Sequence, residues 1–302
     1  MSNYALGVDV GATKVAIATI GDDFKVRQKI EVSTKCGDGL KLWGNIADAA
    51  RDFIALENGV LKGIGVASAG PLNIVKGTIS PVNISVWRDF PIINCFEEIS
   101  KSSPVVLHGD AMALAHAEHK LGAGQGLKNM LGMVVSTGVG GGLILDNKVF
   151  TGESGNAFFL GHTSVNFEGP SCACGRRGCV ETYASGPRMV AHAQSRGWVS
   201  EDASFVSLAG DAEKGDQIAL AVIDEGTRAL AVGIINALGS LDISNVVIGG
   251  GVTESGAIFW EPLRRHVKEQ ASFIGFLGEI HLHKAALVRD AGVLGAALAI
   301  LG

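Results

Sequence analysis

The sequence predicts an α/β protein of two related domains, and three observations lead to this prediction. The chain has 302 residues, about twice the ~150 residues of an average domain. Hydrophobic residues make up 47% and charged residues 18%, which is enough apolar material for a sizeable core. A pattern of strand, glycine turn and strand occurs twice, with starts about 125 residues apart. Two unrelated hairpins would give the same pattern, so this alternative stays open.

The first half alternates apolar runs with turns. Two apolar runs flank the polar turn Gly11-Ala12-Thr13-Lys14, which predicts a strand and a return strand. A segment with helical spacing follows, and after it comes a buried-strand run that ends at Gly70-Pro71. A short strand and a further helix come next. In this order, the predicted elements cover 4–10, 15–20, 40–56, 64–69, 105–107 and 111–121.

The second half begins with the same pattern. Strands over 131–135 and 141–145 flank the polar glycine turn 136–140. A loop-rich stretch covers 151–185, and a strand over 245–248 runs into three glycines. Helices are predicted over 187–194, 217–238, 258–270 and 290–297.

Composition excludes several classes of function. The net charge is −5 and no basic stripe is present, so nucleic acid is not an expected partner. The longest apolar stretches have about a dozen residues, whereas a membrane span needs ~20. The N-terminus lacks the basic and apolar regions of a signal peptide. We therefore expect a cytoplasmic protein, in which disulfides are rare.

Glycine is abundant, with 42 residues, and three glycine-rich turns follow predicted strands. Glycine lets backbone N–H groups converge on an anion because no Cβ blocks the approach. None of the turns matches the Walker or the dinucleotide pattern, and each alone is also typical of a structural hairpin. Together they favour a nucleotide held between the domains. The candidate nucleotide-binding residues are Asp9, Gly11, Thr13, Lys14, Thr137, Gly138, Gly140, Gly250 and Gly251.

One imidazole and three thiols lie close together in the sequence. His162 is followed by Cys172, Cys174 and Cys179, with the spacing His-x9-Cys-x-Cys-x4-Cys. One histidine and three cysteines complete a tetrahedral Zn²⁺ site, and four protein ligands leave no open position for water. We therefore expect a structural zinc that fixes a loop. The alternative is a set of free thiols.

Asp110 follows a predicted strand and precedes a predicted helix. An aspartate there is most often a helix N-cap. Beside a bound phosphate, it would instead accept the proton of an attacking hydroxyl during phosphoryl transfer. The neighbouring His108, His116 and His119 are interpreted as surface or capping residues.

These motifs together resemble the ROK family of bacterial sugar kinases and related repressors, over essentially the whole chain. The family's phosphate-binding start resembles residues 6–14, its Ser-Thr-Gly-x-Gly-Gly-Gly turn 136–142, and its nucleotide-side glycine run 248–252. Its most specific signature is complete here as Gly161, His162, Cys172, Cys174, Gly175, Gly178, Cys179 and Glu181.

The resemblance implies a two-domain actin/hexokinase-like (ribonuclease H-like) fold with an interdomain cleft. The N-terminal domain would cover 1–115 and the C-terminal domain, with the zinc loop and the nucleotide side, 116–289. A C-terminal helix over 290–302 would pack back on the N-terminal domain. ROK repressors carry a helix-turn-helix before the kinase-like body, and a first strand at Tyr4 leaves no room for it. An enzyme is therefore implied, as a homodimer or homotetramer.

The implied activity is ATP- and Mg²⁺-dependent phosphorylation of a sugar 6-hydroxyl, in a protein that carries structural Zn²⁺. Asp110 would be the general base. By the same resemblance, Gly70, Asn83 and Glu181 would contact the sugar. His162 would both bind zinc and stand at the sugar pocket.

The sequence departs from the family at two places. Gly109 stands where the family usually has asparagine, which removes a contact to a sugar hydroxyl. Phe158 and Phe159 stand where it usually has Gly-Glu, and N-acetylmannosamine kinases have histidine in place of the glutamate. A phenyl ring at 159 would pack an apolar substituent such as an N-acetyl methyl group, or would fill the pocket.

The resulting hypothesis is a kinase acting on a hexose or N-acylhexosamine, with N-acetylmannosamine the first candidate and glucose the second. A sugar-binding sensor without strong activity is the alternative from another class. Whether polyphosphate replaces ATP stays open.

Overall fold

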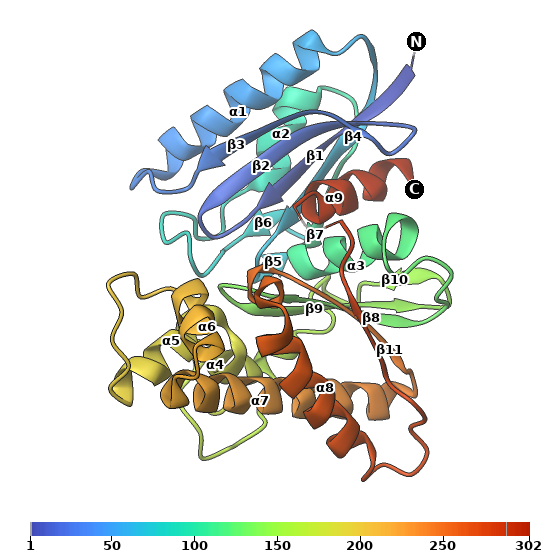
Figure 1. Cartoon of the computed structure of the whole chain (residues 1–302). Coiled ribbons are helices and arrows are strands. Elements are labelled where there is room, and N and C mark those ends of the chain that lie inside the picture. Colours follow the sequence, from blue (N-terminus) through green and yellow to red (C-terminus); the bar gives the residue numbers. More distant parts are fainter. Residues whose placement is uncertain (1, 288) are drawn as a thin grey trace. The chain divides into compact units, whose positions relative to one another are not determined.

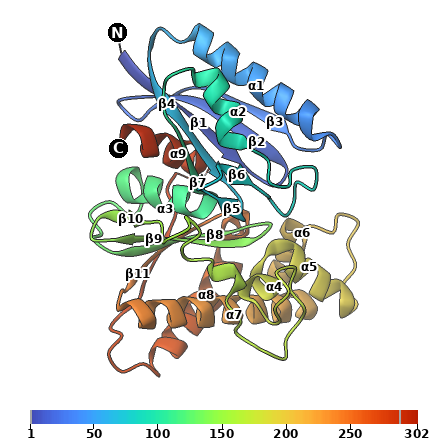
Figure 2. The same ribbon diagram turned by 180° about the vertical axis from the view of Figure 1, so that it is seen from behind.

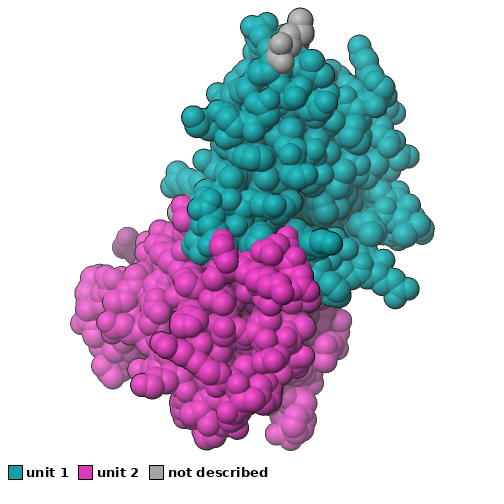
Figure 3. Space-filling view, turned by 90° about the vertical axis from the view of Figure 1, so that its right-hand side faces the viewer, with its two compact units in different colours: residues 1–125, 148–157, 287–302 teal, residues 126–147, 158–286 magenta. Residues whose placement is uncertain are grey.

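The computed structural model describes residues 2–287 and 289–302 (Figures 1 and 2). The chain forms two compact units, which Figure 3 shows in different colours. Unit 1 comprises residues 1–125, 148–157 and 287–302, and unit 2 comprises 126–147 and 158–286. Unit 1 is therefore discontinuous, because the chain returns to it after unit 2.

The first sheet has the strand order β3-β2-β1-β4-β7. The β1–β2 and β2–β3 pairs are antiparallel, whereas β4 runs parallel to β1 and to β7. The strands are β1 (Ser2–Val10), β2 (Lys14–Gly21), β3 (Val26–Ser33), β4 (Gly59–Ser68) and β7 (Val105–Gly109). A small hairpin of β5 (Leu72–Asn73) and β6 (Thr78–Ile79) follows β4.

The second sheet repeats this topology with the order β10-β9-β8-β11-β12. The β8–β9 pair is antiparallel, and β11 runs parallel to β8 and β12, as in the first sheet. The strands are β8 (Met130–Val135), β9 (Val139–Leu145), β10 (Lys148–Phe150), β11 (Asn245–Gly249) and β12 (His281–Lys284). The predicted repeat is confirmed, and the alternative of two unrelated hairpins is wrong.

Helices cover both faces of the first sheet. Figure 1 shows α1 (Gly39–Leu56) and α2 (Ile92–Ser100) on one face, and α3 (Asp110–Leu121) and α9 (Ala291–Leu301) on the other. Large side chains such as Ile46 and Phe96 fill the core under α1 and α2. Under α9 the buried cluster is Ala67, Ala113 and Ala296, so the two faces pack at different depths.

Glycines let α9 approach the sheet closely. A Cβ atom at Gly7 would overlap the carbonyl of Val293, and one at Gly65 would overlap the carbonyl of Ala296. Helix α9 thus lies against β1 and β4 with its backbone almost in contact with theirs. Side chains at the sheet glycines would force it away.

In unit 2 the long helix α7 packs against the other helices of that unit. The unit-2 helices are α4 (Val180–Ala184), α5 (Gly186–Ser195), α6 (Phe205–Glu213), α7 (Gln217–Leu241) and α8 (Ala257–Ala271), with the short helices η1 (Leu160–His162) and η2 (Gly251–Ser255). No helix of the described residues is long and apolar enough to span a membrane.

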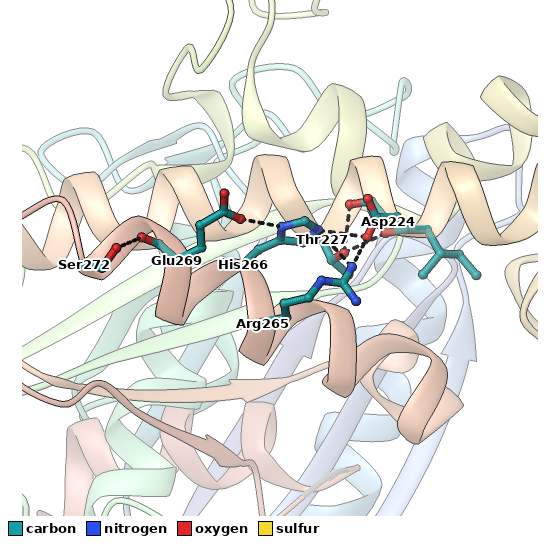
Figure 4. Close-up of polar contacts among 7 residues, drawn as sticks. Asp224, Thr227, Arg265, His266, Glu269 and Ser272 are labelled. Carbon is teal, nitrogen blue, oxygen red and sulfur yellow. Dashed lines mark hydrogen bonds and ion pairs between the residues drawn. The ribbon is translucent and has the colours of Figure 1, made fainter.

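Helices α7 and α8 are also joined by polar contacts (Figure 4). Asp224 on α7 lies 2.9 Å from Nε2 of the buried His266 and forms an ion pair with Arg265, both on α8. Glu269 lies 3.7 Å from His266 Nδ1. These contacts add polar interactions to the apolar packing between α7 and α8.

Every strand and helix predicted from the sequence is present, and the structure adds elements that the sequence analysis did not assign. Strand β3 lies at a sheet edge, and its alternation of apolar and charged residues was its signal. Helix α2 has Pro91 as its N-cap, and strand β12 has only four residues. Strand β12 is too short for periodicity to reveal, whereas Ile92, Phe96 and Ile99 give α2 a helical spacing that the sequence analysis missed.

We expect Gly65→Ala to lower the free energy of unfolding by at least ~1–3 kcal/mol, because the new methyl group overlaps the carbonyl of Ala296. Gly44→Ala, on α1, is the matched control, since nothing lies within 4 Å of its new methyl group. It should be neutral or stabilising by up to ~1 kcal/mol. Urea unfolding of both variants measures the difference, and equal effects would contradict the close approach.

Candidate functional site

Two acidic side chains of unit 1 stand at the carboxyl ends of strands. Asp9 is the next-to-last residue of β1, and Asp110 directly follows β7 as the first residue of α3. Because β1, β4 and β7 are parallel, these ends share one edge of the sheet. Asp110 Oδ1 accepts a hydrogen bond from Ala111 N at 2.7 Å. The N-cap of α3 is Gly109, so the interpretation of Asp110 as the N-cap is wrong.

The two carboxyl groups interact electrostatically. The pKa of Asp9 is raised from 3.8 to about 7, first by burial and then by the charge of Asp110, while Lys29 and Lys14 oppose the rise. A carboxyl group with a pKa near 7 exchanges its proton at neutral pH and gains strongly from a nearby cation. This pair is therefore a candidate for phosphate-linked chemistry.

None of the three histidines near Asp110 is an exposed surface residue, contrary to expectation. Burial lowers the pKa of His108 and lowers that of His116 to about 4, and His119 is buried. The reason is that α3 packs against α9 and against β4 and β7, so little of it reaches solvent.

The first glycine turn joins β1 to β2. Gly11 N donates to Lys14 O at 3.1 Å, and Thr13 and Lys14 are exposed. The ammonium group of Lys14 pairs with Glu31 of β3 at 2.6 Å. The sequence analysis missed this partner, although the alternating pattern of 26–33 would have placed Glu31 on a neighbouring strand.

The predicted sugar-side residues of unit 1 lie in turns. Gly70 follows Ala69, whose N–H donates to Val10 O at 3.3 Å, so the end of β4 is fixed beside the end of β1. Asn83 is exposed in the turn closed by the hydrogen bond from Ile84 N to Pro81 O at 3.1 Å.

In unit 2 the second and third glycine turns lie at the same end of the sheet. Thr137 is exposed between Ser136 and Gly138, whose backbones are hydrogen bonded at 2.8 Å. Gly250 has φ of 102°, and a Cβ there would overlap the carbonyl of Val135 at the end of β8. Only glycine allows β11 to end this close to β8.

His162, Cys172, Cys174 and Cys179 come together in the structure, with all four ligand atoms within 4.8 Å of one another. Cys174 Sγ and Cys179 Sγ are 3.7 Å apart, and His162 Nδ1 is 3.3 Å from Cys172 Sγ. Tetrahedral Zn²⁺ with Zn–S bonds of ~2.3 Å requires S···S distances of ~3.8 Å. The donor set therefore fits zinc.

One carboxylate links this cluster to the second glycine turn. Glu181 Oε1 lies 3.9 Å from His162 Nε2, the ring nitrogen that faces away from Cys172. Glu181 Oε2 accepts a hydrogen bond from Val139 N at 2.9 Å, and a Cβ at Gly138 would stand 2.7 Å from it. A carboxylate in this position orients a metal-binding imidazole. The same group holds the turn 136–138, and Gly140 is the second residue of β9, just beyond that turn.

The two phenylalanines before η1 have different surroundings. Phe158 has a positive φ of 67°, which disfavours a bulky residue, and its ring packs on the core of unit 2. Phe159 is 52% exposed, and its ring lies 4.3 Å from that of His162 with an interplanar angle of 33°. The structure thus offers an exposed aromatic face beside the cluster.

Comparison with known proteins agrees with this geometry. The model of the ROK family matches residues 5–301. An N-acetylmannosamine kinase of Yersinia pestis is 34% identical over 294 residues, which cover 97% of both chains.

Two solved structures share the fold. A ROK hexokinase from Thermus thermophilus has a TM-score of 0.86 and 33% identity, and covers 98% of this chain and 97% of its own. A ROK glucokinase from Streptomyces griseus, in complex with glucose and AMPPNP, has a TM-score of 0.84 and 29% identity, covering 98% and 99%. The expected fold class is confirmed, and the chain belongs to the ROK family.

Proposed function

We propose that this protein transfers the γ-phosphoryl group of ATP to the 6-hydroxyl of N-acetylmannosamine. The observation that supports it best is the Asp9–Asp110 pair at one sheet edge of unit 1, in a chain whose relatives are sugar kinases. Glucose is the second candidate, because the Streptomyces griseus relative binds it.

Asp110 is the proposed general base. The sugar 6-oxygen forms a bond to the γ-phosphorus, the bond from that phosphorus to the β,γ-bridging oxygen breaks, and ADP leaves. The hydroxyl proton passes to the Asp110 carboxylate. Its hydrogen bond with Ala111 N holds the carboxylate at the start of α3.

The glycine turns would bind the phosphates. In unit 1 the β1–β2 turn offers backbone N–H groups and the exposed hydroxyl of Thr13. In unit 2 the turn after β8 offers the exposed Thr137 and the backbone of Gly138, and η2 begins at Gly251. Donors fixed before the reaction stabilise developing phosphate charge without reorganisation.

Mg²⁺ would accompany ATP, and its preference for oxygen ligands fits the carboxylate of Asp9. When bound, it would neutralise part of the phosphate charge. The negative charge of Asp110 disfavours a second negative charge on Asp9. A bound Mg²⁺ would therefore stabilise the ionised carboxylate of Asp9.

Zinc would fix the loop that carries His162 and Glu181. Its proposed role is structural, because four protein ligands close the site. Through Glu181 the loop would also fix the glycine turn at Val139. The exposed ring of Phe159 would pack the apolar methyl of an N-acetyl group.

Several finer points stay predictions. These are a cytoplasmic location, a homodimer or homotetramer, and domain boundaries at 115 and 289, while the use of polyphosphate in place of ATP stays open. A sugar-binding sensor would bind sugars without turnover, and a coupled ADP-release assay across a hexose panel distinguishes it from an enzyme.

We expect Asp110→Asn to lower kcat by ~10²–10⁴-fold while sugar binding survives, because the amide cannot accept the proton. Asp48→Asn is the control, since the side chain of Asp48 is 76% exposed and forms an ion pair with Arg51 on the surface. Steady-state kinetics and calorimetric titration with the sugar measure both. A variant that keeps more than roughly a tenth of wild-type kcat would show that Asp110 is not the base.

Protein purified without added zinc should contain one Zn²⁺ per chain. Cys174→Ser should lose the metal and thermal stability, because metal binding contributes folding energy. Cys95→Ser should keep both, since Cys95 lies outside the cluster. Elemental analysis and thermal denaturation test this, and metal-free protein that is folded and active would refute it.

Phe159→His should raise kcat/KM for N-acetylmannosamine, and Phe159→Glu should shift preference towards glucose. A regained hydrogen bond is worth ~0.5–1.5 kcal/mol if neutral and ~1.5–3 if charged, which is several-fold to about a hundredfold. The double variant Phe158→Gly/Phe159→His also relieves the positive φ at 158 and is the stronger test. If folded, zinc-loaded variants show no gain on any hexose, this segment does not line the sugar pocket.

A further inference from the structure

The carboxylate of Asp9 lies against Gly292, the second residue of α9. A Cβ at Gly292 would overlap Oδ2 and Cγ of Asp9 and would stand 3.0 Å from its Cβ. The clash involves the whole side chain of Asp9. Because this side chain is short, moving its terminal atoms alone would not relieve the clash. Any side chain at 292 therefore requires that Asp9 adopt another rotamer or that α9 shift.

The start of α9 is held in place by other contacts. Lys29 Nζ of β3 pairs with Asp290 Oδ1 at 2.8 Å and donates to Arg289 O at 3.0 Å. The buried Glu118 of α3 accepts a hydrogen bond from Leu287 N at 2.7 Å. Helix α9 is thus anchored on two sides just before Gly292.

The body of α9 is equally constrained. The close approaches at Gly7 and Gly65 set the depth of α9 on the sheet. A Cβ at Gly295 would likewise overlap the carbonyl of Ala113 on α3. A methyl group at 292 would consequently displace the carboxylate of Asp9 before it displaces the helix.

We propose that Gly292 is a positioning residue that sets where the Asp9 carboxylate stands beside Asp110. The missing side chain at 292 leaves the space that the Asp9 carboxylate occupies in this structure. The C-terminal helix, together with the β1–β2 turn, would then determine the geometry of the part of unit 1 that is proposed to bind the phosphates of ATP. This inference rests on the proposed kinase activity, but the contact between Gly292 and Asp9 does not.

The test compares Gly292→Ala with Gly44→Ala, which adds the same methyl group to a helix of the same unit where nothing lies within 4 Å. Gly292→Ala should lower kcat by about a hundredfold, as a misplacement of ~1 Å does. Its affinity for Mg²⁺ with a non-hydrolysable ATP analogue should fall, while calorimetric sugar affinity stays unchanged. A purely structural defect would weaken both ligands together.

A double-mutant cycle with Asp9→Ala separates the contact from the activity. If Gly292→Ala acts through Asp9, it should lower the Tm of the wild type more than that of Asp9→Ala, which keeps the Cβ at 3.0 Å but lacks Cγ and Oδ2. Equal losses of Tm in both backgrounds would overturn the proposal.

The two hypotheses fail in different ways. If the wild type phosphorylates a sugar and Gly292→Ala has the same kcat, the positioning role is wrong and the proposed kinase activity is retained. If the wild type turns over no sugar but the Tm changes of the double-mutant cycle are non-additive, the proposed kinase activity is wrong. The contact between Gly292 and Asp9 is then still supported. Should Gly292→Ala fail to fold, a folded Asp9→Ala/Gly292→Ala supports the proposal, and failure of both overturns it.

Discussion

Unit 1 depends on the depth at which α9 lies on its sheet. Glycines at 7 and 65 remove the side chains that would separate the helix from the strands, and Ala67, Ala113 and Ala296 form a buried cluster there. Backbone therefore approaches backbone, and dispersion contacts are dense although the side chains are small. The edge that carries Asp9 and Asp110 derives its geometry from this packing.

In unit 2, polar contacts rather than close helix packing hold the corresponding part of the sheet in place. Its glycine turn after β8 is held by a carboxylate, because Glu181 bonds Val139 N and faces His162. A metal on the four clustered ligands would fix that carboxylate through the imidazole. One repeat thus relies on close helix packing and the other on a chain of polar contacts.

Much of the fold and of the site was predictable, because the signals were local. The strand–turn–strand repeat, the ligand spacing and Asp110 are all readable within short windows of sequence. The contacts that were missed join distant segments: Lys14 with Glu31, Asp9 with Gly292, and the buried histidines of α3 with the helix that covers them. A glycine in an apolar helix shows no polar pattern in the sequence. Only the packed structure reveals which neighbouring group occupies the space that its side chain would fill.

The discontinuity of unit 1 also matters while the chain is being made. Synthesis proceeds from the N-terminus, so β1 and β4 emerge long before α9, with all of unit 2 in between. Until then the part of the first sheet that α9 covers, over β1 and β4, lacks its helix, and the backbone at Gly7 and Gly65 has no side chain to shield it. Pairing of such distant segments is slow, so the surface that α9 covers stays exposed until the last part of the chain has been made.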